Sequence, residues 1–283
     1  GNEVVCIIRD GEDPVPVGIG GQDAPEQATP PLAGAIPDEM HIARRMQSEL
    51  LPPVAELEWI QHSYGLKITS FFETSSVLGG DLWGLDPMDD HRFSLWLADF
   101  SGHGVTAALN TFRLHTLLEH ISTGRDRPAA FLAEVNQRLA GLLPLGQYAT
   151  MLYGVVDVRA GLFTYAAAAA PRPIVAIPGQ PVAVGDGSGL PLGVTRKATY
   201  VERSLALPPG SALFMASDAL TETPAEDGSK LGSAGAVDLV QRVVDARGGD
   251  VDTDAILAPF LATVKRPLRD DLTAVCCLRP ALG

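Results

Sequence analysis

The sequence predicts an α+β fold in which antiparallel sheets are covered by helices. Two observations lead to this fold class. Strand-like apolar runs follow one another as hairpins and do not alternate strictly with helices, which favours antiparallel pairing over a parallel sheet. Apolar residues make up 46% of the 283 residues, enough for a packed core in one large domain or in one domain with an appendage.

The N-terminal part reads differently from the rest. Residues 3–9 are typical of one strand, and residues 10–37 are rich in Gly, Pro, Asp and Gln, as linkers are. We therefore divide the chain into a strand and linker over residues 1–37 and a main domain over residues 38–283. Since the first residue is Gly1 and not Met, we expect either a piece of a longer protein or the remainder of a tag. In the first case, residues 1–37 would be the remnant of, or link to, an upstream domain.

A helix is expected from about Asp38 to just before Pro52-Pro53, because Ile42, Met46 and Leu50 recur at i, i+4 spacing on one face. The rest of the domain contains apolar runs of strand length and longer stretches with helical periodicity. Strands are expected at residues 66–72, 93–100, 148–158, 161–169, 173–177, 199–206, 211–217 and 273–278. Further helices are expected at about residues 104–121, 128–142, 233–246 and 253–264.

Composition excludes several classes of function. The net charge of −13 argues against a surface for nucleic acid or for an anionic membrane, although bound divalent cations would still admit a phosphorylated substrate. No signal peptide and no long apolar stretch is present. The three cysteines form no disulfide framework, with Cys276 and Cys277 pointing to opposite faces of one strand, so we expect a reducing, cytoplasmic location.

Four short acidic motifs stand at the ends of strand-like runs or in the turns beside them. They are Gly79-Gly80-Asp81, Asp99-Phe100-Ser101-Gly102-His103-Gly104, Ser217-Asp218-Ala219 and Asp270-Asp271-Leu272-Thr273. Each aspartate taken alone is explained as well by a turn or a helix cap. Together they predict a cluster of carboxylates, which repel one another unless a cation lies between them. Oxygen ligands of this kind suit Mg²⁺ or Mn²⁺, not Zn²⁺.

The motifs, in this order, resemble the metal-dependent protein phosphatase family (protein phosphatase type 2C), in its bacterial branch of RsbU- and SpoIIE-like enzymes. The similarity covers residues 43–278. It includes the helix at residues 43–52, which ends in Gln47-Ser48-Glu49-Leu50-Leu51-Pro52, and the Asp-x-x-Gly-His-Gly segment at Asp99. Residues 189–193 and 208–222 match two further stretches of the family.

The resemblance implies an αββα four-layer sandwich with two Mn²⁺ or Mg²⁺ ions at one end. It implies that Asp81 bridges both ions and that Asp99 binds one, helped by the main-chain carbonyl of Phe100. Asp218 and Asp270 would complete the ligand set, with Asp271 as the alternative to Asp270. These aspartates are therefore the expected catalytic and metal-binding residues.

Two stretches depart from the family's pattern. Ala219 follows Asp218 where Gly is usual, and its methyl group would crowd a backbone of positive φ. The run Ala167-Ala168-Ala169-Ala170 stands where the branch often carries Asn-Ala-Gly-His. We expect this second departure to affect loop geometry or a substrate contact and not metal binding.

The general acid and the phosphate ligand stay open. Ser101 occupies the place of the acid histidine of the wider family. His103 is either an acid or a structural residue of the strand–helix turn. Arg44 and Arg45 are interpreted as a solvated helix face.

The resemblance predicts a phosphoserine/phosphothreonine protein phosphatase of a bacterial signalling or stress-response pathway. Its expected substrate is a phosphorylated anti-sigma-factor antagonist, and its expected regulator an upstream sensor or receiver domain. A pseudophosphatase that only binds a partner is the alternative, and a nuclease or phosphodiesterase is disfavoured by the acidic charge. We further expect the helix at residues 38–51 to regulate the domain, by packing against the core or against the same helix of a second chain in a homodimer. The alternative is that it packs permanently on its own domain as a core helix.

Overall fold

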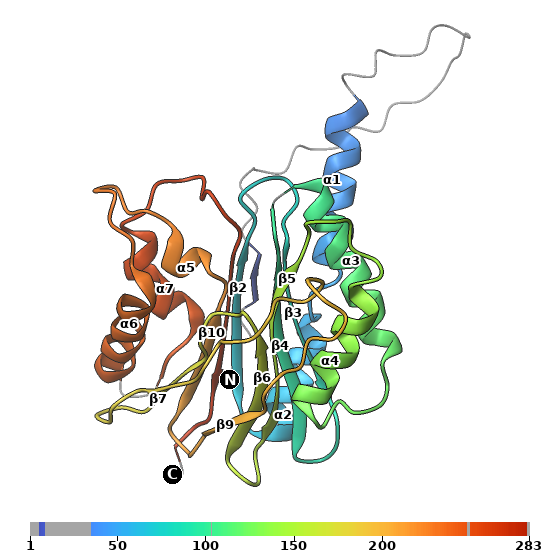
Figure 1. The fold of residues 1–283 in the computed structure, drawn as a ribbon. Coiled ribbons are helices and arrows are strands. Elements are labelled where there is room, and N and C mark those ends of the chain that lie inside the picture. The colour runs from blue at the N-terminus through green and yellow to red at the C-terminus, as the bar shows by residue number, and fades with distance from the viewer. Residues whose placement is uncertain (1–5, 9–34, 103, 248–249, 282–283) are drawn as a thin grey trace, which may run out of the picture.

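Two β-sheets lie face to face between two layers of helices (Figure 1). This computed structural model describes residues 6–8, 35–102, 104–247 and 250–281. The arrangement confirms the expected α+β fold with four layers. All neighbouring strands pair antiparallel except β1 and β2, which are parallel.

The first sheet has six strands and combines segments from both ends of the chain. Its strand order is β1 (Cys6–Ile8), β2 (Lys67–Glu73), β11 (Leu272–Leu278), β10 (Ala212–Ala216), β7 (Ile174–Ala176) and β8 (Ala183–Val184). The second sheet has five strands in the order β3 (Asp81–Pro87), β4 (Arg92–Phe100), β5 (Ala149–Asp157), β6 (Leu162–Ala168) and β9 (Arg203–Ala206). Strands β3 to β6 are neighbours in chain order: short hairpins join β3 to β4 and β5 to β6, whereas the connection from β4 to β5 contains α3 and α4.

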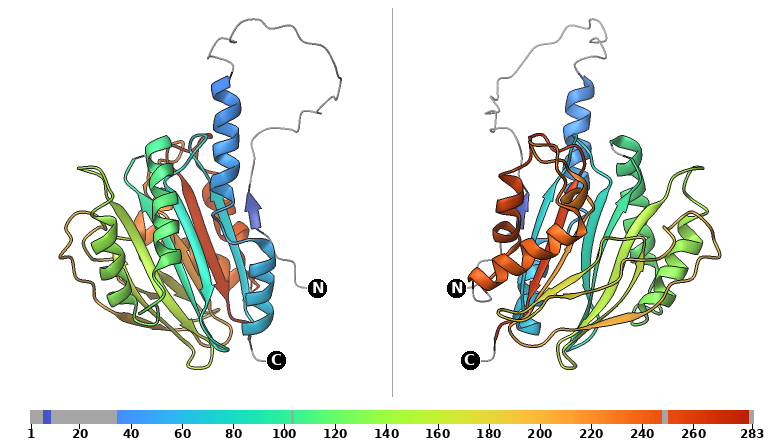
Figure 2. Two further views of the ribbon diagram at one scale, coloured as in Figure 1. Left: turned by 90° about the vertical axis from the view of Figure 1, so that its right-hand side faces the viewer. Right: turned by 60° about the vertical axis from the view of Figure 1, so that its left-hand side comes forward.

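Each sheet has its own helices on its outer face, as Figures 1 and 2 show. The first sheet is covered by α5 (Ala219–Glu222), α6 (Gly232–Arg247) and α7 (Thr253–Leu261). The second is covered by α3 (Val105–His120) and α4 (Pro128–Leu139). The helix α2 (Val54–Tyr64) contacts β2, and α1 (Ala35–Ser48) contacts α3 and extends beyond the ends of the strands.

The central strand β11 shows how the layers are held together. All seven of its residues are buried. Val275 and Cys277 belong to the apolar cluster that includes the second sheet, whereas Ala274 and Cys276 belong to the cluster beneath α6 and α7. Alternate side chains of a strand point to opposite faces, so β11 is apolar throughout. This confirms the expected opposite orientation of Cys276 and Cys277.

Two substantial elements differ from expectation. The first helix ends at Ser48, before Pro52-Pro53 as expected, but the sequence did not predict the helix α2 that follows, in which Pro53 takes the position before the first turn, where its fixed φ is compatible. The sequence also predicts a turn after a strand at Gly79-Gly80-Asp81, whereas Asp81 opens the strand β3. Gly84 weakens the strand pattern there, and it is needed because a Cβ at this position would collide with the Trp96 ring.

The N-terminal segment differs from expectation in extent. α1 begins at Ala35, three residues before Asp38, and therefore crosses the expected boundary between residues 37 and 38. β1 lies within the expected strand at residues 3–9 and joins the first sheet beside β2. The expected linker lies outside the described residues up to residue 34. The division into two parts stays a prediction.

Candidate metal centre

The aspartates of the four motifs meet where the two sheets come together at one end. Asp81 pairs directly with Asp99 across β3 and β4. Asp218 follows β10, and Asp270 and Asp271 precede β11, the antiparallel neighbour of β10. Because β11 also contacts β3, aspartates from both sheets share one site.

Asp81 lies deepest in this site. It is 1% exposed, and both of its carboxylate oxygens are buried without a hydrogen-bond partner. Burial raises the pKa of Asp81 well above its usual range, and the charges of Asp99 and Asp271 raise it further. The nearby Thr273 and Ser217 hydroxyls, which do not meet hydrogen-bond geometry, lower this pKa in part. A buried carboxylate without partners is costly unless a cation or proton compensates it. The residues present therefore fit a divalent cation.

The neighbouring carboxylates are perturbed in the same direction. Burial and then the charges of Asp218 and Asp270 raise the pKa of Asp99 to about 8. Burial and then Asp270 raise the pKa of Asp218. These shifts arise from desolvation and like-charge repulsion, the two effects that a bound cation would reverse.

Gly79 and Gly80 allow the close approach of the backbone that the site needs. A Cβ at Gly79 would lie 2.7 Å from Oδ2 of Asp271, and one at Gly80 would lie 3.0 Å from the carbonyl oxygen of Phe100. Both positions exclude any larger residue without a shift of the structure. The same contacts place the Phe100 carbonyl beside the motif that carries Asp81.

Asp271 differs from the other aspartates because both of its oxygens are already hydrogen-bonded. Oδ1 accepts from the backbone nitrogen of Ser75 at 2.6 Å and from its hydroxyl at 2.9 Å. Oδ2 accepts from the backbone nitrogen of Gly80 at 2.6 Å. Asp271 thus attaches the loop before β3 to the start of β11.

Gln47 on α1 is a residue of the site that the sequence reasoning missed. Its side chain is buried and donates to the carbonyl of Gly79 at 2.7 Å and to the Thr111 hydroxyl at 3.1 Å. Its Oε1 accepts from the nitrogen of Gly79 at 3.1 Å. The available signal was its place in the motif helix, where an uncharged polar residue lies among apolar and charged ones.

Ser217 is a second such residue. Its hydroxyl donates to the carbonyl of Asp271 at 3.1 Å and accepts from the nitrogen of Thr273 at 3.0 Å. It therefore joins the end of β10 to the start of β11 beside Asp218. Only the pairing of these strands reveals this role.

The departures from the family pattern have distinct outcomes. Ala219 begins α5, and its φ is not positive, so the expected crowding does not arise. Ala169 instead has φ +54°, and it is the only non-glycine residue with positive φ in the described part of the chain. The Ser101 hydroxyl accepts from the backbone nitrogen of Tyr148 at 3.1 Å. His103 lies outside the described residues.

The two arginines of α1 differ in exposure. Arg45 is exposed and Arg44 is half-buried on the helix. The interpretation of a solvated helix face stays a prediction.

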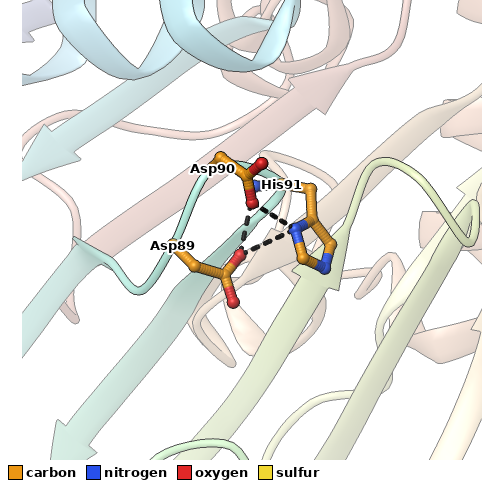
Figure 3. Close-up of side chains that lie close together, drawn as sticks. All are labelled: Asp89, Asp90 and His91. Carbon is orange, nitrogen blue, oxygen red and sulfur yellow. Dashed lines mark hydrogen bonds and ion pairs between the residues drawn. The ribbon is translucent and has the colours of Figure 1, made fainter.

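A second group of titratable residues occupies the turn at the opposite end of the β3–β4 hairpin (Figure 3). Asp89, Asp90 and His91 bring one possible ligand atom each within 4.8 Å of one another. However, Nδ1 of His91 lies 2.7 Å from Asp90, and Asp89 accepts from Nε of Arg92 at 2.8 Å. Asp89 also accepts from two backbone nitrogens, so the group is explained as a closed turn.

Comparison with known proteins agrees with this geometry. The SiaA-PP2C domain of Pseudomonas aeruginosa has a similar fold, with a TM-score of 0.73 and 22% identity over 88% of this chain and 99% of that one. The RsbU and RsbW domains of Rv1364c from Mycobacterium tuberculosis give a TM-score of 0.64 and 27% identity over 77% of this chain and 61% of that one.

Among curated proteins, the phosphoserine phosphatase RsbP of Bacillus subtilis (strain 168) is 29% identical over 137 residues. These residues are 47% of this chain and 32% of RsbP, so the chain matches about a third of that relative.

In the described residues, no helix is both long and apolar enough to cross a membrane. The sequence pattern described as stage II sporulation protein E (SpoIIE) matches residues 89–280, more than half of the chain, which therefore belongs to the SpoIIE family.

Proposed function

We propose that this domain is a metal-dependent phosphoserine/phosphothreonine protein phosphatase. The observation that carries the proposal is the buried Asp81 carboxylate without a hydrogen-bond partner, surrounded by Asp99, Asp218, Asp270 and Asp271. Family membership and the similarity to a phosphoserine phosphatase support the same reaction. The convergence of these carboxylates speaks against the alternative of a module that only binds a partner.

In this proposal, Asp81 would hold two Mn²⁺ or Mg²⁺ ions. Asp99, the carbonyl of Phe100, Asp218 and Asp270 provide the remaining protein ligands. Asp270 is preferred to Asp271 because both oxygens of Asp271 already accept hydrogen bonds from Ser75 and Gly80. When bound, such ions supply Lewis acidity for the attack of water on phosphorus.

The chain's own residues then hold the reacting groups in place. Asp271 and Gln47 fix the Gly79-Gly80 loop from two sides, which sets the position of Asp81. Ser217 ties the end of β10 to β11 and thereby positions Asp218. A ligand set built from four chain segments needs such supports to keep its geometry.

We further propose that the substrate is a phosphorylated anti-sigma-factor antagonist and that an upstream sensor or receiver domain controls the enzyme. Two similarities support this assignment. RsbP is a phosphoserine phosphatase, and Rv1364c of Mycobacterium tuberculosis contains both an RsbU and an RsbW domain. The acidic chain would meet its partner through specific contacts and not through general charge attraction.

α1 is the element through which we propose that control passes. Ile42 and Met46 expose 52% and 51% of their surface, whereas Gln47 on another face of the helix holds Gly79. An apolar face directed to solvent fits a second copy of the helix or an upstream segment. A change in its packing would reach the loop before Asp81 through Gln47.

The activity is tested by titrating Mn²⁺ and Mg²⁺ into the purified chain with a phosphoserine peptide and a nucleotide diester measured side by side. We expect hydrolysis of the peptide only, with complete loss in EDTA and recovery when the cation is returned. Peptide hydrolysis that survives full chelation would refute the metal-dependent mechanism. Preferential hydrolysis of the diester would point to the phosphodiesterase that the charge disfavours.

A further inference from the structure

A cavity of about 250 Å³ opens beside the aspartate cluster. It lies between the segment at residues 169–174, the end of β10 and the first turns of α5 and α6. Asp218 and Ser217 form part of its wall, and so does Thr150, the β5 partner of Asp99. The cavity is therefore connected to the site at two independent points.

The deeper wall of this cavity is apolar. It consists of side chains from both the sheet and the helices: Ala169, Ala170, Ile174, Phe214, Leu220, Ala236 and Val237. Most of these residues are buried members of the core beneath α6. The polar groups stand elsewhere on the wall, with Asp218 as the anion and Arg172 as the cation among the lining residues. Such a wall stabilises an apolar group and penalises a charged one.

We propose that this cavity receives an apolar side chain of the phosphoprotein, from a residue within two positions of the phosphoserine. The proposal rests on the proposed phosphatase function. A phosphoserine held at the aspartates places its neighbours about 3–7 Å away along an extended chain. Since Asp218 belongs to both the cluster and the cavity wall, a neighbouring side chain reaches the cavity without a bend in the substrate.

The alanines explain why the cavity has room for a substrate. Ala169 and Ala170 contribute only methyl groups to the wall next to Asp218. Ala169 also holds a left-handed backbone conformation, with φ +54°, and the residues that follow it, Ala170 to Arg172, line the cavity as well. A leucine, methionine or phenylalanine side chain is the chemical class that matches the lining in polarity.

The first test uses phosphoserine peptides that are identical except for Leu or Ala at one of the two positions on either side of the phosphoserine. With the unmodified protein and Mn²⁺, we expect one Leu position to raise kcat/KM by roughly tenfold to a hundredfold, the size expected for burying one apolar side chain. Equal turnover of the Leu and Ala peptides at every position would overturn the proposal.

The second test blocks the cavity at its exposed mouth. Ser233 lines the cavity in the first turn of α6, and the adjacent Ala234 is exposed and does not line it. We expect Ser233→Phe to abolish the preference for Leu while p-nitrophenyl phosphate is hydrolysed as before. Ala234→Phe is the matched control and should keep both activities. A Ser233→Phe protein that keeps the preference would contradict the assignment.

Fluorescence anisotropy with the same labelled peptides separates the cavity from the reaction. A Leu preference in binding that Ser233→Phe removes would support the cavity even if no phosphate ester were hydrolysed. In that outcome the phosphatase proposal alone would fail. Hydrolysis of all peptides without any Leu preference in rate or binding would leave the phosphatase proposal standing and reject the cavity.

Discussion

At the residue scale, Asp81 combines deep burial, a negative charge and the absence of a hydrogen-bond partner. We expect Asp81→Asn and Asp218→Asn to lower hydrolysis at saturating Mn²⁺ on the order of a hundredfold or more, since changes to supporting residues alone cost 10–100-fold at metal sites. Both variants should fold, because each removes one charge from a repelling cluster. Steady-state kinetics and calorimetric Mn²⁺ titration measure the two effects.

Asp89→Asn is the matched control for these variants. Asp89 lies on the same hairpin as Asp81 but in the turn at its other end. The Asp89→Asn substitution should leave turnover and Mn²⁺ affinity unchanged. Near wild-type turnover of Asp81→Asn or Asp218→Asn would show that the ligand assignment is wrong.

The pKa of Asp99 leads to a prediction about pH and stability. Its pKa is raised from 3.8 to about 8 in the folded chain, so the folded state binds a proton that the unfolded state releases. Without metal, the stability that this proton contributes is fully present below about pH 4. It is lost as the pH rises toward 8, at about 1.4 kcal/mol per pH unit. We expect the free energy of unfolding in EDTA to fall over this range by less in Asp99→Asn than in the unmodified protein.

Urea denaturation at several pH values measures this difference. Saturating Mn²⁺ should reverse the trend in the unmodified protein, because the cation favours the charged carboxylates. An equal pH dependence in both proteins would mean that Asp99 does not titrate in this range.

Among the described non-glycine residues, Ala169 alone has a positive φ, +54°, a left-handed conformation that is unfavourable for a residue with a Cβ. Replacing it by Gly removes the clash of Cβ in this conformation but adds the entropy of glycine to the unfolded state. We expect Ala169→Gly to stabilise the fold by about 0.5–1 kcal/mol. Ala168→Gly, one position earlier in β6, should destabilise it. Denaturant midpoints compare the two, and destabilisation by both would exclude strain at Ala169.

At the scale of the element, α1 presents different chemistry on its two faces. Ile42 and Met46 are half exposed, so replacing both by Gln should change the free energy of unfolding by no more than about 0.5 kcal/mol. We expect the same change to alter self-association or specific activity while Mn²⁺ affinity is retained. Light scattering and kinetics measure this, with His41→Gln, a polar exposed residue of the same helix, as the control.

The result distinguishes a regulatory helix from a permanent part of the core. Unfolding of the double variant, with unchanged mass and unchanged activity of the folded fraction, would show that α1 is a core helix. The exposure of Ile42 and Met46 argues for the regulatory role, because a core helix would bury them. Two packings of similar energy are what such a switch requires.

At the scale of the whole molecule, the candidate site joins the two sheets. Asp81 and Asp99 belong to one sheet, whereas Asp218 and Asp270 adjoin strands of the other. A cation held between them should therefore raise Tm. At a cation concentration of a hundred times Kd, the added free energy of unfolding is about 2.7 kcal/mol. Differential scanning fluorimetry with Mn²⁺ measures this shift. Asp81→Asn should reduce it strongly, and an undiminished shift in that variant would place the cation elsewhere.

The order of most elements followed from the sequence, because apolar spacing is a local property. The strands at residues 211–217 and 273–278 and the helix at residues 128–142 were each expected within a few residues of their bounds. The missed elements have local reasons. Pro52-Pro53 is both a helix stop and a suitable helix start, and Gly84 hides the strand β3.

What the sequence determined by itself is the chemistry: the aspartates, their places at strand ends and the fold class that brings such ends together. Tertiary structure alone decided how those groups are supported. Asp271 reaches Ser75 and Gly80 across about 190 residues of sequence, and Gln47 reaches Gly79 from another helix. The cavity beside Asp218 likewise forms from distant segments. Local periodicity predicts elements, but contacts between distant segments depend on how the sheets pack, which no local pattern contains.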